Sequence, residues 1–214
     1  MIILKAKTVT FNGMPVKRKI PYDSGHFFIT FTCCNWLPLI DITNSYDLVY
    51  NWFDYLKKQG HYITGYTIMP NHVHVTIAFR KTKKSINTIV GDGKRFIAYE
   101  IINRLKEKGE VSLLSKLAQA VHISDRAKGQ LYEIWEDSFV PKAFGRKECN
   151  SIKFIMQKLD YMHNNPCTGK WQLAVNAIEY LHSSARFYLT GEQGIYPVLN
   201  FQELEDIDLN SFSF

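Results

Sequence analysis

The sequence predicts an α+β domain in which helices pack on one face of an antiparallel sheet. Strand-like segments alternate with long amphipathic segments, and two of the strands are joined by a tight turn, which is typical of antiparallel pairing. The 214 residues suffice for one domain with a buried core, and the 46% hydrophobic composition excludes a disordered chain. No repeat, low-complexity tract or linker divides the sequence. We expect a lead-in over residues 1–22, a single domain over 23–190 and an acidic tail over 191–214.

The first half of the chain predicts three strands and one helix. They are a strand over residues 26–36, a helix over about 46–60, and strands over 62–68 and 73–79. Asn44 or Ser45 can cap the helix, which ends at Gly60. Met69-Pro70-Asn71 has the chemistry of a hairpin turn, because proline fixes its φ angle and asparagine accepts unusual backbone angles.

The second half predicts helices more than strands. They are a long helix over about 85–108, a helix over about 149–163 and a short helix over about 183–189, with an apolar segment over 111–120 and a Trp-bearing segment over 131–144 between the first two. Gly91 and Gly93 are expected to weaken the middle of the long helix. Pro166 ends the later helix, because it cannot donate the next backbone hydrogen bond.

Composition narrows the class of protein. The most apolar stretch, residues 26–40, is interrupted by polar residues and is too short for a membrane span. The first residues lack the apolar centre and cleavage site of a signal peptide, so we expect a cytoplasmic protein with no membrane partner. Four irregularly spaced cysteines predict reduced thiols rather than a disulfide framework. A net charge of +6 and a pI near 9.0 are compatible with a polyanionic partner.

The segment His72-Val73-His74-Val75 could bind a metal. Residues two apart in a strand point to the same face, so His72 and His74 would project side by side. Two imidazoles can hold one divalent cation, although a third ligand is needed. Histidines on a half-buried strand also occur without any metal, and the short pattern alone favours that simpler interpretation.

The helix end around Tyr161 and Asn165 supplies a second group. These residues are four apart and share one face of a helix. An amide oxygen at Asn165 could complete the metal site, with His163 as a competitor, and the Tyr161 phenol could act as a nucleophile. Imidazoles with an amide oxygen suit Mg²⁺ or Mn²⁺. The alternative is that Asn165 and Pro166 only terminate the helix while Tyr161 packs in the core.

Taken together, the motifs resemble a family. Four segments in order resemble the REP-associated tyrosine transposases, a single-tyrosine branch of the HUH endonuclease superfamily. They are Tyr66 to His74 (YTIMPNHVH), Val90 to Phe96 (VGDGKRF), Gln157 to Pro166 (QKLDYMHNNP) and Tyr180 to Tyr188 (YLHSSARFY). The chain departs from the family at Gly93, where relatives usually carry a bulky apolar residue, and around residues 135–139.

This resemblance implies a fold and a chemistry. It implies a ferredoxin-like core with the His pair on a central strand and the tyrosine on a later helix. It also implies Mg²⁺ or Mn²⁺ held by His72, His74 and Asn165, and cleavage of single-stranded DNA near a hairpin by Tyr161. Cleavage would leave a 5′-phosphotyrosine and a free 3′-OH, which allows rejoining and hence transposition. The family contains both monomers and homodimers.

Basic side chains flank these motifs in three places. Single-stranded or hairpin DNA needs a cationic groove, and each residue taken alone is also explained as solvated surface. The expected DNA-binding residues are Lys81, Lys83, Lys84, Lys94, Arg95, Lys142, Arg146 and Lys147.

Two other functions remain open from the sequence. His74-Val75-Thr76 and His182-Ser183-Ser184 each match the H-x-T/S pair of metal-free two-histidine phosphodiesterases, although His122-Ile123-Ser124 matches this short pattern too. That enzyme would retain activity in EDTA. The other alternative is a domesticated protein that binds hairpin DNA but does not move it.

Overall fold

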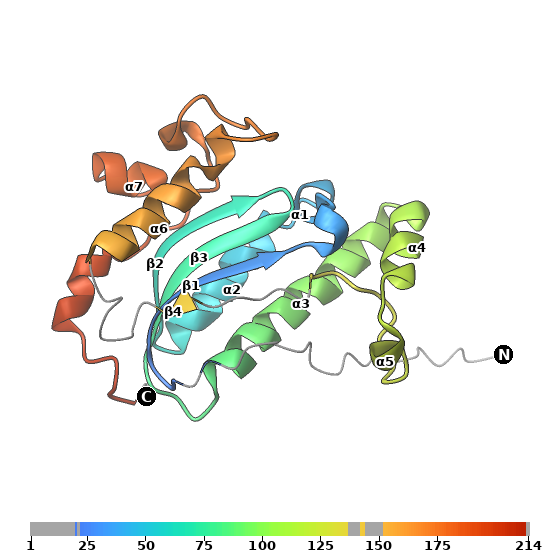
Figure 1. The fold of residues 1–214 in the computed structure, drawn as a ribbon, viewed down its shortest axis with the longest axis horizontal. Helices are drawn as coiled ribbons and strands as arrows, with labels where there is room; N and C mark the ends of the chain where they lie inside the picture. The colour runs from blue at the N-terminus through green and yellow to red at the C-terminus, as the bar shows by residue number, and fades with distance from the viewer. Residues whose placement is uncertain (1–19, 21, 137–141, 144–151, 213–214) are drawn as a thin grey trace.

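The computed structural model describes residue 20 and residues 22–136, 142–143 and 152–212. Its strands are β1 (Gly25–Thr32), β2 (Tyr62–Met69), β3 (His72–Phe79) and β4 (Lys142–Ala143). Its α-helices are α1 (Leu39–Ile42), α2 (Tyr46–Lys58), α3 (Ile86–Glu107), α4 (Val111–Gln119), α5 (Ile123–Arg126), α6 (Ile152–Asn164) and α7 (Ala185–Thr190). Four short 3₁₀ helices are η1 (Cys34–Trp36), η2 (Asn165–Cys167), η3 (Ala177–Glu179) and η4 (Phe201–Asp206). The predicted α+β class is confirmed (Figure 1).

One antiparallel sheet forms the centre of the molecule. Its strand order is β2-β3-β1-β4, and β3 lies antiparallel to both β2 and β1. The register places His74 between Thr30 of β1 and Thr67 of β2. Every residue of β3 is buried, so the strand is covered on both faces.

Helices α2 and α3 cover one face of the sheet. Val73, Val75 and Ile77 of β3 pack in the main core with side chains such as Trp52 and Phe53 of α2. The long helix α3 is continuous through Gly91 and Gly93, contrary to the weakened middle that the sequence predicts. Its buried residues recur every three or four positions, so tertiary packing outweighs the cost of two glycines.

Helix α6 covers the opposite face, which corrects the expectation that helices pack on one face. Its Leu159 and Met162 form a second core cluster with Phe28 of β1 and Phe201 of η4. In Figure 1, α6 and α7 lie on the other side of the sheet from α2 and α3. The sequence does not reveal this second layer, because the apolar residues of β3 alternate with histidines and a threonine. Such polar residues do not predict a strand face that is covered by a helix.

The C-terminal part of the chain runs along the outer edge of β2. The backbone N–H of Ile68 donates to the His182 carbonyl at 2.9 Å, and that of Ser184 donates to the Tyr66 carbonyl at 2.9 Å. Farther along, Leu199 N–H donates to the Ile63 carbonyl at 3.0 Å. The segment predicted as an acidic tail therefore lies against the domain over its described part. Within the ranges described here, no helix is long and apolar enough to cross a membrane.

Candidate active site

The site lies on the α6 face of the sheet, at the β1–β3 pair. His72 and His74 alternate with the core-facing valines, and their rings lie 4.7 Å apart between centroids. Both imidazoles are buried at 5% and 4% exposure. Phe28 of β1 stacks on His74 with ring centroids 5.5 Å apart, so an apolar wall fixes the inner side of the pair.

Asn71 fixes the tautomer of His72. Its amide nitrogen donates to the backbone carbonyl of Trp36 at 3.0 Å, which turns its amide oxygen toward the His72 ring. That oxygen lies 2.7 Å from His72 Nδ1 and can only accept, so Nδ1 carries the proton. The Nε2 atom of His72 therefore presents a lone pair.

His74 is oriented in the same way. Its Nδ1 lies 2.7 Å from the Thr30 hydroxyl, and the Asn165 amide nitrogen lies 3.3 Å from its Nε2. Because the amide N–H donates, Nε2 accepts and Nδ1 donates to Thr30. Both rings thus direct an Nε2 lone pair outward from the strand, each held by a partner on Nδ1, as metal-ligating histidines require.

Burial keeps both imidazoles uncharged. It lowers the pKa of His72 to about 4, with an opposing effect from the hydrogen bond to Asn165. It also lowers the pKa of His74 well below its ordinary value, with further lowering by the neighbouring His72 and Lys158. Neutral imidazole is the form that binds a cation.

Tyr161 and Asn165 reach the His pair from the end of α6. The Tyr161 ring lies 5.4 Å from the His74 ring between centroids, yet 53% of this residue is exposed. Lys158, one turn earlier, places its ammonium 5.8 Å from the Tyr161 ring centroid. A phenol that is open to solvent beside neutral imidazoles and a cation is accessible to an anionic substrate.

His163 and His182 lie elsewhere. The Nε2 of His163 lies 2.9 Å from the Ser184 hydroxyl, on the α7 side of α6, so Asn165 is the neighbour of His74 and His163 is not. The His182 ring stacks on Tyr46 of α2 at 3.8 Å and its Nδ1 lies 3.0 Å from the Tyr50 hydroxyl. His182 therefore packs on the α2 side of the sheet, away from His74, which does not favour a two-histidine phosphodiesterase.

Trp36 is a site residue that sequence reasoning missed. Its ring lies 6.0 Å from the His72 ring, and 56% of the residue is exposed. Trp36 and Asn35 have φ values of 56° and 53°, which non-glycine residues adopt only at a cost. The pairing of Asn71 with the Trp36 carbonyl holds this conformation. An Asn-Trp pair after a strand is the signal present in the sequence, but it does not reveal where the indole lies.

The expected DNA-binding residues divide into separate groups. Lys81, Lys83 and Lys84 follow the far end of β3, about 20 Å or more along the strand from the His pair, so they do not line the site as expected. Lys94 is 5% exposed, contrary to the open position expected of a phosphate ligand, whereas Arg95 is partly exposed beside Asp92. For Lys142 only the position of the β4 backbone is described, and Arg146 and Lys147 lie outside the described residues.

The donor set of the site is two imidazoles and an amide. Across the described ranges, no group of three or more His, Cys, Asp or Glu side chains could hold a metal. The two Nε2 lone pairs fit a cation if a half-turn of the Asn165 amide presents its oxygen instead of its nitrogen. Such a set of few, neutral ligands leaves room for water and substrate oxygens, as hard divalent cations prefer.

Comparison with solved structures finds similar folds. The chain resembles a structure described as a REP-associated tyrosine transposase bound to a REP hairpin, with a TM-score of 0.50 and 17% sequence identity. The likeness covers 92% of this chain and 93% of that one. No protein-family model and no curated protein matches the chain. At this identity the likeness shows a shared fold, a mixed arrangement of helices around an antiparallel sheet.

Proposed function

We propose that the protein is a metal-dependent endonuclease and strand transferase for single-stranded DNA near hairpins, with Tyr161 as its nucleophile. The observation that carries this proposal is the meeting of Tyr161 and Asn165 of one segment with His72 and His74 of another, 87 or more positions earlier. Four chemically suitable side chains from two distant segments seldom converge on one small area of a domain without a shared role.

In the proposed reaction, Tyr161 forms a bond to the phosphorus of the scissile phosphate. Its phenolic oxygen attacks the phosphorus, the bond between phosphorus and the 3′ oxygen breaks, and a 5′-phosphotyrosine with a free 3′-OH results. The phenolic proton passes to the 3′ oxygen in the balanced reaction. Because a phosphodiester bond replaces another of similar kind, the reverse attack by a 3′-OH can rejoin strands without a further energy source.

His72, His74 and Asn165 would hold Mg²⁺ or Mn²⁺ in this proposal. When bound, the cation would neutralise charge on the scissile phosphate and on the leaving 3′ oxygen. Asn71 and Thr30 hold the imidazole rings, Lys158 adds positive charge beside Tyr161, and the exposed Trp36 provides a face on which a flanking base can stack.

The architecture supports the proposed substrate. The order β2-β3-β1-β4 with β3 antiparallel to its neighbours agrees with a ferredoxin-like core. The structural neighbour is bound to a REP hairpin, and we extend hairpin DNA to this chain as its proposed partner. A homodimer is compatible with the proposal and is not required by it, since all four site residues come from one chain.

Detection of a covalent adduct between Tyr161 and DNA tests this proposal. Hairpin oligonucleotides with labelled single-stranded flanks are incubated with the protein and Mn²⁺, then resolved on a denaturing gel and by mass spectrometry. We expect a DNA adduct on Tyr161 that is lost in Tyr161→Phe and in EDTA. Tyr188→Phe is the matched control, because this tyrosine is turned toward the Thr64 carbonyl and not the site. Cleavage without an adduct would indicate a hydrolase, and tight binding without cleavage would indicate a domesticated hairpin-binding protein.

A further inference from the structure

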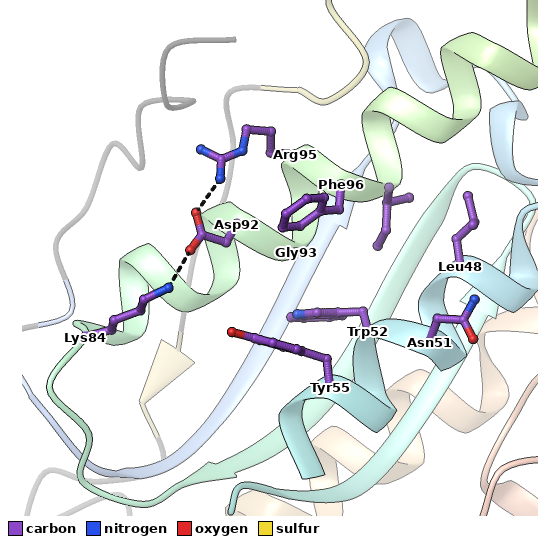
Figure 2. A pocket seen from close by; sticks show the side chains of 10 residues that line it. Leu48, Asn51, Trp52, Tyr55, Lys84, Asp92, Gly93, Arg95 and Phe96 are labelled. Atoms are coloured by element: carbon purple, nitrogen blue, oxygen red, sulfur yellow. Dashed lines mark hydrogen bonds and ion pairs between the residues drawn. The ribbon is translucent and has the colours of Figure 1, made fainter. Parts of the chain in front are cut away.

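A pocket between α2 and α3 lies on the opposite side of the sheet from His72 and His74. Its volume is about 440 Å³, within the range of ligand sites in proteins. Figure 2 shows that α2 contributes one wall and α3 the other. Its lining includes Trp52, Tyr55, Lys84, Gly93, Arg95 and Phe96.

Aromatic rings dominate the walls of this pocket. Phe96 is 66% exposed and Tyr55 is 45% exposed, whereas Trp52 is buried at the back of the pocket. In Figure 2 the rings of Trp52 and Tyr55 come from successive turns of α2 and face Phe96 of α3. A flat, apolar group entering here would meet aromatic rings from both helices, and aromatic side chains are the groups on which unpaired bases stack.

Gly93 lets the Trp52 ring pack directly against α3 at the back of the pocket. A Cβ atom at this position would lie 2.2 Å from Trp52 Nε1, so only glycine permits this approach of α2 to α3. The buried Trp52 N–H has no hydrogen-bond partner among the described residues.

Two basic side chains lie at the opening of the pocket. Lys84 and Arg95 both contact Asp92, at 3.4 Å and 3.0 Å (Figure 2). One carboxylate shared by two cations leaves a net positive mouth, and exposed ion pairs of this kind exchange partners at little cost. A second hollow of about 410 Å³ continues the groove, since it shares Tyr55 and Lys84 and adds Lys83.

We propose that this pocket receives an unpaired base of the DNA strand, with the neighbouring phosphates against Lys84 and Arg95. The inference rests on the substrate of the proposed function but not on its chemistry. It gives Lys83, Lys84 and Arg95 a role in DNA binding on the face opposite Tyr161, so a bound strand would contact two faces of the domain. The positive charge at the opening of the pocket favours a nucleic acid over a second copy of the chain, which itself has a net charge of +6.

The test measures DNA affinity and base stacking in the full chain. A hairpin oligonucleotide carries 2-aminopurine at each unpaired position in turn, because stacking on a ring quenches its fluorescence. We expect quenching at one position, lost in Phe96→Ala and Tyr55→Ala, with an affinity loss of about 5- to 100-fold. Leu189→Ala is the control, since Leu189 of α7 is 61% exposed and lies outside the pocket.

A charge variant tests the mouth separately. Lys84→Ala should lower the slope of log affinity against log salt by about 0.7, the value for one phosphate contact to a single strand. Lys128→Ala is a close match, because Lys84 and Lys128 have side-chain exposures of 59% and 57% and each contacts one aspartate. Unchanged affinity and quenching in the pocket variants would overturn the inference, as would a loss of dimer with no change in DNA affinity.

The experiments can disprove the base-binding pocket and the tyrosine mechanism independently of each other. A Tyr161 adduct with unaltered DNA affinity in Phe96→Ala and Lys84→Ala would overturn the pocket and leave the chemistry standing. Absence of any adduct, with weakened binding in the same variants, would support the pocket and overturn the tyrosine mechanism. All of these variants change exposed side chains, so their folding is checked directly by thermal unfolding.

Discussion

At the scale of single residues, the Asn71 side chain links His72 to the exposed Trp36. Its amide oxygen accepts from His72 and its amide nitrogen donates to the Trp36 carbonyl, so one side chain fixes both the tautomer of a proposed metal ligand and the backbone of an exposed aromatic residue. Two successive residues with positive φ cost about 1 kcal/mol or more each. Strain of this kind next to a site indicates that the position of the Trp36 ring matters.

We therefore predict that Trp36→Ala weakens binding of single-stranded DNA by about 5- to 100-fold, because one stacked base contributes about 1 to 3 kcal/mol. Trp36→Phe should retain most of the affinity. Fluorescence anisotropy at fixed salt measures this, with Leu189→Ala on α7 as the control at an exposed apolar residue. An equal loss in both alanine variants would show that stacking beside His72 is not the cause.

Thr30 is predicted to act through His74. Thr30→Val keeps the shape of the side chain but removes the hydroxyl that accepts from His74 Nδ1. Loss of such a partner lowers metal affinity by about 10- to 100-fold, so calorimetric titration with Mn²⁺ should show a decrease of this size. Thr190→Val removes an exposed hydroxyl that bonds the Arg186 carbonyl and should leave Mn²⁺ binding unchanged. Unaltered affinity in Thr30→Val would exclude a positioning role.

At the scale of elements, Gly65 determines how closely α6 approaches the sheet. A Cβ atom there would lie 2.6 Å from Met162 Cε and 2.7 Å from Leu159 Cδ2. Gly65 also lies at a register shift between β2 and β3. The helix that carries Tyr161 thus rests on a strand position without a side chain.

We predict that Gly65→Ala lowers the free energy of unfolding by about 1 to 3 kcal/mol and displaces α6, because overpacking forces neighbouring elements apart. Adduct formation should fall with it. Gly91→Ala is the opposite case, since a Cβ atom at this mid-helix position meets nothing within 4 Å, and it should raise stability by about 0.5 to 1 kcal/mol. Urea denaturation compares them, and a stable Gly65→Ala would refute the close-packing argument.

The sequence predicted individual elements better than their layers. The hairpin at Met69-Pro70-Asn71 and the helix that ends near Gly60 depend on local turn and capping chemistry, which is readable along the chain. The cover of α6 on the second face was not predicted, because it depends on long-range packing of Leu159 and Met162 at Gly65. The sequence identified His72, His74, Tyr161 and Asn165, which the structure brings together, and their roles stay predictions. It missed Trp36 and Thr30, because only tertiary contacts place these two residues beside the His pair.

At the scale of the whole molecule, buried histidines link folding to pH. His61 and His163 lie outside the proposed metal site, and burial lowers the pKa of each to about 4, with Arg80 contributing at His61. The backbone N–H of Arg80 donates to His61 Nδ1 at 3.2 Å, so this nitrogen cannot take a proton without losing that bond. Both side chains are nearly inaccessible to water.

The sign of the pH dependence follows from these lowered pKa values. Near pH 7 both histidines are neutral in the folded and the unfolded chain, so they contribute no dependence there. Between about pH 6.5 and pH 4 the unfolded chain binds protons that the folded chain does not, so stability falls as pH falls, by roughly 2 kcal/mol per histidine at pH 5. Below about pH 4 this contribution levels off.

Urea denaturation at pH 7.5 and pH 5.0 measures this effect. We expect His163→Gln, whose amide can still bond the Ser184 hydroxyl, to remove about half of the two-histidine contribution to the pH dependence. His122→Gln, at the exposed start of α5, is the control and should leave the dependence as it is in the parent chain. Equal stability of the parent chain at the two pH values would contradict the argument, because two neutral imidazoles sealed in the fold must oppose protonation as the medium becomes acidic.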